Sequence, residues 1–379
     1  MNGSKHHETT SPLHQITKLP GHTCLTAHRS SLFLRALSVP YGWVTQCRNS
    51  LYDRGWLSQR RLPCRVISIG NLTVGGTGKT PITIAVTEAL LAAGRRVAVL
   101  SRGYRRRSGA SRVLVADGRK ILVGPDEAGD EPFLIAQRCP GAIVAVGADR
   151  YQLGGWVLAE YRIDCVVLDD GFQHRALARD VDLLLVDATD TRGLHALIPA
   201  GRLREPLSSA ARATAVLVTR VDASVDAQPI VSMIQHATGK TVQPILIRFA
   251  PQRLIDVSNG SDVPLEQVAG QRVVLFSGIG NAGAFRTSVL SQGLTVVDEV
   301  IFSDHHAYAI SDVNRVRARA AEAGVSVLVT TEKDAVKLRC LPLLSTPVWA
   351  VRLETQILDG AERLKQLIIG DGRGGRGDG

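Results

Sequence analysis

The chain of 379 residues is 45% hydrophobic and 21% charged. This length is enough for two ordinary domains, and the composition excludes a disordered or fibrous protein. A formal net charge of +10 predicts anionic partners. Aromatic residues make up only 4% of the chain, so we expect phosphorylated substrates or acidic lipid surfaces and no nucleic acid. The six cysteines are scattered without a zinc-type spacing, which is typical of reduced thiols.

The N-terminal region contains one apolar segment. Residues 1–28 are polar, lack the pattern of a secretory signal, and are expected to form a disordered extension. The segment 32–52 is interrupted by Arg35, Pro40 and Arg48, so it lacks the run of about 20 apolar residues that a spanning helix needs. Two interpretations stay open for it: an interfacial helix lying on a membrane, or a helix packed on its own domain.

Two series of strands and helices follow. Apolar runs at 66–69, 97–100, 143–146, 166–168, 183–186 and 216–218 predict buried strands, with a helix at 81–93 between the first two. Continuous apolar strands separated by helices predict an α/β fold with a mostly parallel sheet covered on both faces, which we assign to residues 29–222.

The second series predicts a smaller α/β domain over residues 223–369. Its expected strands are 242–247, 273–276, 296–302, 325–329 and 348–351, with helices at 282–291 and 311–323. The tail 370–379 contains only Gly, Arg and Asp and is expected to be disordered.

A glycine-rich loop joins the first predicted strand to its helix. A loop with this spacing in a strand–loop–helix context is a Walker A motif, whose backbone N–H groups and helix N-terminus bind nucleotide phosphates. Lys79 is expected to reach the β- and γ-phosphates of ATP, and Thr80 to offer its hydroxyl to Mg²⁺. The first glycine of the motif is replaced by Thr73. The expected nucleotide-binding residues are Thr73, Val74, Gly75, Gly76, Thr77, Gly78, Lys79 and Thr80.

Acidic residues supply the next candidates. Asp169 and Asp170 follow a buried strand, where a Walker B acid lies close to Mg²⁺. Because adjacent strand side chains point in opposite directions, only one of them is expected to approach the metal directly. A kinase that acts on a hydroxyl also needs a group that takes or orients the hydroxyl proton. The candidates for this role are Asp130 and Glu131, and the residues 304–306. A single acid at a helix start is usually a cap, which is the alternative for Asp130.

Six strings of residues resemble one family, the tetraacyldisaccharide 4'-kinases of lipid A biosynthesis. The resemblance begins near Leu32 and continues almost to the end of the chain, and it includes Thr73 as a regular part of the loop. The strings are Ile69-Gly70-Asn71-Leu72-Thr73-Val74-Gly75-Gly76-Thr77-Gly78-Lys79-Thr80-Pro81, Leu100-Ser101-Arg102-Gly103-Tyr104, Gly129-Asp130-Glu131-Pro132, Asp149-Arg150-Tyr151, Asp169-Asp170-Gly171-Phe172-Gln173-His174 and Gly201-Arg202-Leu203-Arg204-Glu205-Pro206.

This resemblance implies an Mg²⁺-dependent transfer of the ATP γ-phosphate to the 4'-hydroxyl of an acylated glucosamine disaccharide 1-phosphate. It also implies a peripheral enzyme on the anionic cytoplasmic face of a Gram-negative inner membrane. The implied catalytic residues are Lys79, Asp130, His305 and Asp304, with Asp130 and His305 as the acid–base pair and Asp304 orienting His305. The implied metal residues are Thr80, Asp169, Asp170 and Glu131, and the implied substrate residues are Arg150, His174 and Arg204. The family usually has Pro where this chain has Ser303.

Two other classes of protein compete with this interpretation. Thr219-Arg220-Val221-Asp222 resembles the guanine-specificity loop of a GTPase, although Arg220 replaces the lysine and Leu168 stands where a switch motif needs Asp. A non-catalytic protein that binds anions through its basic surface is the third class. A preference for ATP or for GTP distinguishes the kinase from the GTPase. The non-catalytic protein is distinguished from both by Lys79→Ala, which should abolish nucleotide turnover while binding to the anionic partner is retained.

Overall fold

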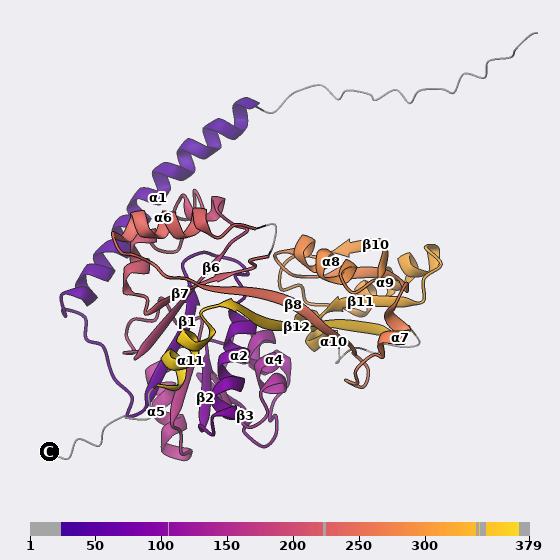
Figure 1. The fold of residues 1–379 in the computed structure, drawn as a ribbon, viewed down its shortest axis with the longest axis horizontal. Coiled ribbons are helices and arrows are strands. Elements are labelled where there is room, and N and C mark those ends of the chain that lie inside the picture. The colour runs from indigo at the N-terminus through magenta and orange to yellow at the C-terminus, as the bar shows by residue number, and fades with distance from the viewer. Residues whose placement is uncertain (1–23, 105, 223–224, 339–340, 342–345, 371–379) are drawn as a thin grey trace, which may run out of the picture.

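The computed structural model describes residues 24–104, 106–222, 225–338, 341 and 346–370. Twelve strands in this part of the chain form one mixed, mostly parallel sheet in the order β10-β9-β11-β12-β8-β7-β6-β1-β5-β2-β4-β3. Helices cover the sheet on both faces (Figure 1), which confirms the predicted α/β fold. Residues 1–23 and 371–379, for which disorder is expected, lie outside the described residues.

A larger core surrounds the parallel half of the sheet, where all six predicted strands are confirmed. Ile67 of the first strand pairs with Val167 on one side and Val181 on the other, so this strand is hydrogen-bonded to a neighbour along both edges and lies inside the sheet. One antiparallel edge strand, β3 (Arg112–Asp117), was not predicted because its residues are partly exposed and end in charges. The parallel strands are β1 (Arg65–Asn71), β2 (Val97–Ser101), β4 (Ile143–Gly147), β5 (Cys165–Asp169), β6 (Val181–Asp187) and β7 (Ala215–Thr219).

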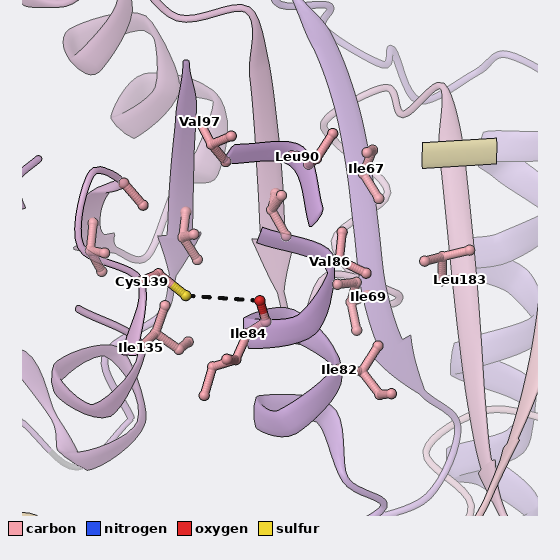
Figure 2. Packing of buried hydrophobic residues seen from close by; sticks show 14 of the residues in the cluster. Ile67, Ile69, Ile82, Ile84, Val86, Leu90, Val97, Ile135, Cys139 and Leu183 are labelled. Atoms are coloured by element: carbon pink, nitrogen blue, oxygen red, sulfur yellow. Dashed lines mark hydrogen bonds between the residues drawn. The ribbon is translucent and has the colours of Figure 1, made fainter. Parts of the chain in front are cut away.

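Helices bury apolar side chains on each face of this core. On one face lie α2 (Lys79–Ala92), α3 (Pro125–Ala128), α4 (Asp130–Arg138) and the last helix, α11 (Ala361–Ile369). On the other face lie α5 (Arg150–Glu160), α6 (Gln228–Thr238) and a 3₁₀ segment, Leu207–Arg212. Figure 2 shows Ile82, Val86 and Leu90 of α2 beside Ile67 and Ile69 of β1. Each such buried side chain stabilises the fold by about 1.5–3 kcal/mol.

A smaller core forms around the other end of the sheet. The three strands β9 (Arg272–Ser277), β10 (Thr295–Ile301) and β11 (Val327–Thr331) were predicted as strands, and they pair in parallel. The helices α9 (Ile310–Glu322) and α10 (Glu332–Leu338) pack on one face, and α8 (Ala282–Leu290) packs on the other with the short helix α7 (Leu265–Val268).

A two-stranded antiparallel ribbon joins the cores. Its strands, β8 (Ile245–Asp256) and β12 (Val348–Asp359), run between the two groups of helices in Figure 1. The predicted strands at 242–247 and 348–351 were therefore too short, because the polar, half-exposed middle of each strand hides the pattern. Residues 223–369 divide between the two cores, since α6, α11 and the first residues of β8 pack with the larger one.

The N-terminal helix α1 (Cys24–Asp53) begins inside the segment 1–28, which corrects the expectation that this segment lies outside the fold. Its second half packs on the larger core, where Tyr41 Oη donates to the Arg204 carbonyl at 2.8 Å and Asn49 Nδ2 to Glu205 at 2.6 Å. Its first half extends beyond the core in Figure 1, where Phe33 is 64% exposed. Trp43, in the second half, is also 74% exposed. Among the described residues, no helix combines the length and apolarity that crossing a membrane requires.

Candidate active site

The phosphate loop has the backbone geometry that its glycines predict. Gly75 and Gly78 adopt φ angles of 114° and 87°, which residues with a Cβ rarely reach. Helix α2 starts at Lys79 without a side-chain cap, so its first N–H groups stay available for an anion. Lys79 Nζ lies 3.3 Å from Asn71 Oδ1, and the buried hydroxyl of Thr77 has no partner among the described residues.

Two side chains from other elements fix this loop. Arg202 donates from Nε and Nη2 to the Val74 carbonyl at 3.0 and 2.8 Å and also pairs with Asp190. Phe249 of the ribbon lies so close to Gly78 that a Cβ there would be 2.3 Å from its ring. Sequence reasoning named Arg202 only within one of the six family strings and gave it no role of its own, and nothing in the local pattern pointed to Phe249.

Both acids of the pair face the start of α2. Asp169, the last residue of β5, is buried and accepts from Thr83 Oγ1 at 3.1 Å and Ser101 Oγ at 3.0 Å. Asp170 has a left-handed φ of 50° and lies 3.8 Å from Lys79 Nζ. The premise of strand alternation does not extend to Asp170, because the strand ends at Asp169, and which of the two carboxylates approaches a metal stays a prediction.

The electrostatics of the two acids differ. Burial, together with the charges of Glu131 and Asp170, raises the pKa of Asp169 above its ordinary value. Burial would raise the pKa of Asp170 as well, but the charges of Lys79 and Arg204 lower it below the ordinary value. Asp169 is therefore a buried carboxylate with two further carboxylates, Glu131 and Asp170, beside it, and a bound cation would relieve their repulsion.

The three expected substrate residues are linked by electrostatics, since Arg204 and Arg150 act on Asp170 and Arg150 acts on His174, but only Arg204 of the three lines the cleft. Arg204 donates to both oxygens of Asp170, at 3.1 and 3.2 Å, and to Asn71 Oδ1 at 2.6 Å. Arg150 is buried at the start of α5, where its Nε has no partner among the described residues. Burial and the charge of Arg150 lower the pKa of His174 to about 4, so this imidazole is neutral at physiological pH.

Asp130 and His305 meet between the two cores. Asp130 is the first residue of α4 and follows the N-cap residue Gly129, so it is not itself the N-cap. Its Oδ2 lies 3.6 Å from His305 Nδ1 and 3.7 Å from Lys337 Nζ. Burial would raise the pKa of Asp130, but the hydrogen bond from His305 and the charges of Lys337 and Lys333 hold it below the ordinary value. Asp130 is therefore ionised and can accept a proton.

Sequence reasoning missed three residues of α10 that complete this cluster. Lys333 Nζ lies 3.0 Å from His305 Nε2 and 3.3 Å from Glu131 Oε1. It also lies 3.9 Å from Asp304 Oδ1, and an orienting contact from Asp304 to His305 stays a prediction. The fully buried Asp334 pairs with Lys337 at 3.0 Å. One signal in the sequence could have indicated these residues, because ligands bind at the carboxyl ends of strands in open sheets. That signal is the polar string at the end of a buried strand, Thr331-Glu332-Lys333-Asp334.

The phosphate loop and this cluster share one cleft. Lys79, Thr80, Asp169, Asp170, Glu131 and His305 all line it, with residues of both cores and of the ribbon. Among the described residues, no three histidine, cysteine or acidic side chains are grouped to hold a metal ion. Mg²⁺ needs fewer, since it binds one or two carboxylates together with water and substrate phosphates. The hydroxyl of Thr80 and the carboxylates beside the loop fit such an ion.

A parallel sheet with this loop, and an acid–histidine pair across the cleft, define a P-loop enzyme of the phosphotransferase type. The chain belongs to the tetraacyldisaccharide-1-P 4'-kinase family, whose sequence profile matches residues 30–370. The tetraacyldisaccharide 4'-kinase of Anaeromyxobacter sp. (strain Fw109-5) is 43% identical over 336 residues, which cover 87% of this chain and 88% of that protein. The one from Syntrophus aciditrophicus is 38% identical over 335 residues, which cover 86% and 89%.

A solved structure agrees with this assignment. The crystal structure of LpxK from Aquifex aeolicus in complex with ATP matches with a TM-score of 0.71 and 33% sequence identity. The match covers 90% of this chain and 98% of that one. The likeness therefore includes both cores and the ribbon between them, and the predicted P-loop fold is confirmed.

Proposed function

We propose that this protein transfers the γ-phosphate of ATP to the 4'-hydroxyl of a tetraacylated glucosamine disaccharide 1-phosphate, a step of lipid A biosynthesis. The proposal is supported by membership of the kinase family along residues 30–370. The observation that carries it is the cleft, which Lys79 and His305 both line, with Asp130 Oδ2 lying 3.6 Å from His305 Nδ1. A nucleotide phosphate and a sugar hydroxyl can meet between them.

The nucleotide side uses the loop and its cation. Residues 73–80 supply backbone N–H groups and the Lys79 ammonium, which stabilise charge on the β- and γ-phosphates. Mg²⁺ would be held by Thr80, Asp169 and Asp170, with Glu131 close by, and when bound it supplies positive charge at the transferred phosphoryl group. Support for this assignment comes from the raised pKa of Asp169 among neighbouring negative charges.

The acceptor side uses Asp130 as the general base. An ionised carboxylate can take the proton of the 4'-hydroxyl as the oxygen attacks the γ-phosphorus. His305 and Lys337 both approach Oδ2 of this carboxylate, and its Oδ1 is proposed to accept the proton from the sugar. Arg150, His174 and Arg204 are proposed to face the anionic head group, where a neutral His174 offers hydrogen bonds and the arginines offer charge.

Helix α1 is proposed to lie on the cytoplasmic face of the inner membrane. Its exposed apolar side chains include Leu32, Phe33, Trp43 and Val44, each more than 60% exposed. Apolar and aromatic side chains flanked by arginines suit the interface of an anionic bilayer. The double variant Phe33→Glu/Trp43→Glu should lose binding to anionic vesicles, while Gln46→Glu, a single acid added on the same helix, should keep it. Equal vesicle binding in all three proteins would refute the membrane assignment.

The test of the activity is transfer of labelled phosphate from ATP to the acylated disaccharide 1-phosphate. Asp130→Asn should lower kcat by about 10²–10⁴-fold, because general-base catalysis contributes that much, while ATP binding is retained. Asp262→Asn, which removes an exposed carboxylate paired with Arg253, is the matched control and should leave turnover unchanged. A preference for GTP without lipid phosphorylation would instead support the GTPase alternative.

A further inference from the structure

Helix α10 brings two lysines to the interface between the cores. Lys333 and Lys337 are four residues apart, so they share one face of the helix. That face meets the start of α4, where Asp130 and Glu131 lie. The two ammonium groups have different surroundings. Lys337 is 11% exposed and is anchored by Asp334 and by the His306 carbonyl at 2.9 Å, whereas Lys333 lines the cleft.

The contact between Lys333 and His305 determines which ring nitrogen carries the proton. Lys333 Nζ lies 3.0 Å from His305 Nε2. An ammonium group has hydrogens to donate and no lone pair to offer, so Nε2 must be the acceptor. A neutral imidazole has one N–H, and with Nε2 as acceptor that hydrogen is on Nδ1. His305 Nδ1 is the nitrogen that faces Asp130 Oδ2, at 3.6 Å.

The position of the ring is fixed by other contacts. His305 has a left-handed φ of 58°, and its N–H donates to the Gly278 carbonyl at 3.0 Å. Tyr104 packs edge-on against the imidazole, with ring centroids 5.6 Å apart. Backbone and packing therefore place the ring, and the contact with Lys333 bears on its protonation at Nε2.

We propose that Lys333 is a positioning residue that holds His305 in the Nδ1–H tautomer, so that His305 donates to the Asp130 carboxylate. In this tautomer the N–H stabilises the ionised base and directs its second oxygen toward the substrate hydroxyl. With the proton on Nε2, the Nδ1 lone pair would face the carboxylate and repel it. The catalytic consequence rests on the proposed function of Asp130, but the tautomer itself does not.

The tautomer can be measured directly by ¹⁵N NMR of protein labelled at histidine. The spectra are recorded about two pH units above the ordinary histidine pKa of about 6.5, and the His305 signals are assigned by their loss in His305→Gln. Wild-type His305 should show the Nδ1–H pattern. Lys333→Met should shift it toward Nε2–H, Lys333→Arg should retain it because guanidinium also donates, and Lys365→Met, at an exposed lysine of α11, should leave it unchanged.

Kinetics give the second measurement. Lys333→Met should lower kcat about 10–100-fold, as loss of a group that orients a functional side chain does, with the KM for ATP changed less than about threefold. Lys333→Arg should recover most of the activity. An Nε2–H pattern in wild type, or an Nδ1–H pattern retained in Lys333→Met or Lys333→Ala, would overturn the proposal. If wild type showed the Nδ1–H pattern but phosphorylated no lipid, the proposed function would fail and the tautomer assignment would stand.

Discussion

The contact between Gly78 and Phe249 connects the phosphate loop to the ribbon, and it can be tested by substituting both residues. An alanine at Gly78 would have to adopt a φ of 87°, which costs about 1–2 kcal/mol for a residue with a Cβ. Its Cβ would also lie 2.3 Å from two ring carbons of Phe249, so the ring or the ribbon must move, at about 1–3 kcal/mol. Gly78→Ala should therefore lower the free energy of unfolding by about 2–5 kcal/mol.

A double-mutant cycle separates the two costs. In a Phe249→Ala background the steric cost disappears, and Gly78→Ala should cost only the backbone strain of about 1–2 kcal/mol. The coupling energy between the two positions should then be about 1–3 kcal/mol. Urea unfolding followed by far-UV circular dichroism measures all four proteins. If Gly78→Ala cost the same in both backgrounds, the ribbon would not restrain the phosphate loop and the reasoning would be wrong.

Three further predictions concern buried polar groups. Thr83→Val should lower the free energy of unfolding by about 1.5–3 kcal/mol in urea denaturation, since it removes one of the hydroxyls that donate to Asp169. Stability should fall as the pH drops from about 6.5 toward about 4, because the folded state depresses the pKa of His174 to about 4 and the unfolded chain binds the proton first. Thermal melts of His174→Asn across this range should be flatter, and equal slopes would contradict this. Asn49→Ala should loosen α1, seen as faster amide exchange there, because Asn49 donates to the buried Glu205.

The local features of the site could be predicted from the sequence. A strand, a glycine-rich loop and a helix are consecutive in the chain, so Lys79 and Thr80 were placed at the helix start by spacing alone. The pair Asp169 and Asp170 ends a buried strand, and the sheet edge where it lies followed from the parallel arrangement. The left-handed backbone of Asp170 could not be predicted, since nothing in an Asp-Asp-Gly string requires it.

Contacts made over long distances in the sequence could not be predicted. Lys333 is 202 residues from Glu131 in the chain, and its helix is only seven residues long with an ordinary pattern of charges. Phe249 lies in the middle of the ribbon, where exposed polar residues hide the strand. Both residues contact the site only because the ribbon folds the smaller core against the larger one, and that packing has no local signature.

The proposed acid–base pair, Asp130 and His305, depends on this packing. Asp130 is held by the larger core through α4, whereas His305 is held by the smaller core through the turn after β10. Their 3.6 Å separation is therefore set by contacts across the interface and belongs to neither core alone. Arg138 of α4 pairs with Glu332 of α10 at 2.8 Å, and Glu332 also pairs with Arg352 of the ribbon at 2.7 Å. Because one partly buried carboxylate connects α4, α10 and the ribbon, the position of Asp130, the proposed general base, and the geometry of the two cores are coupled.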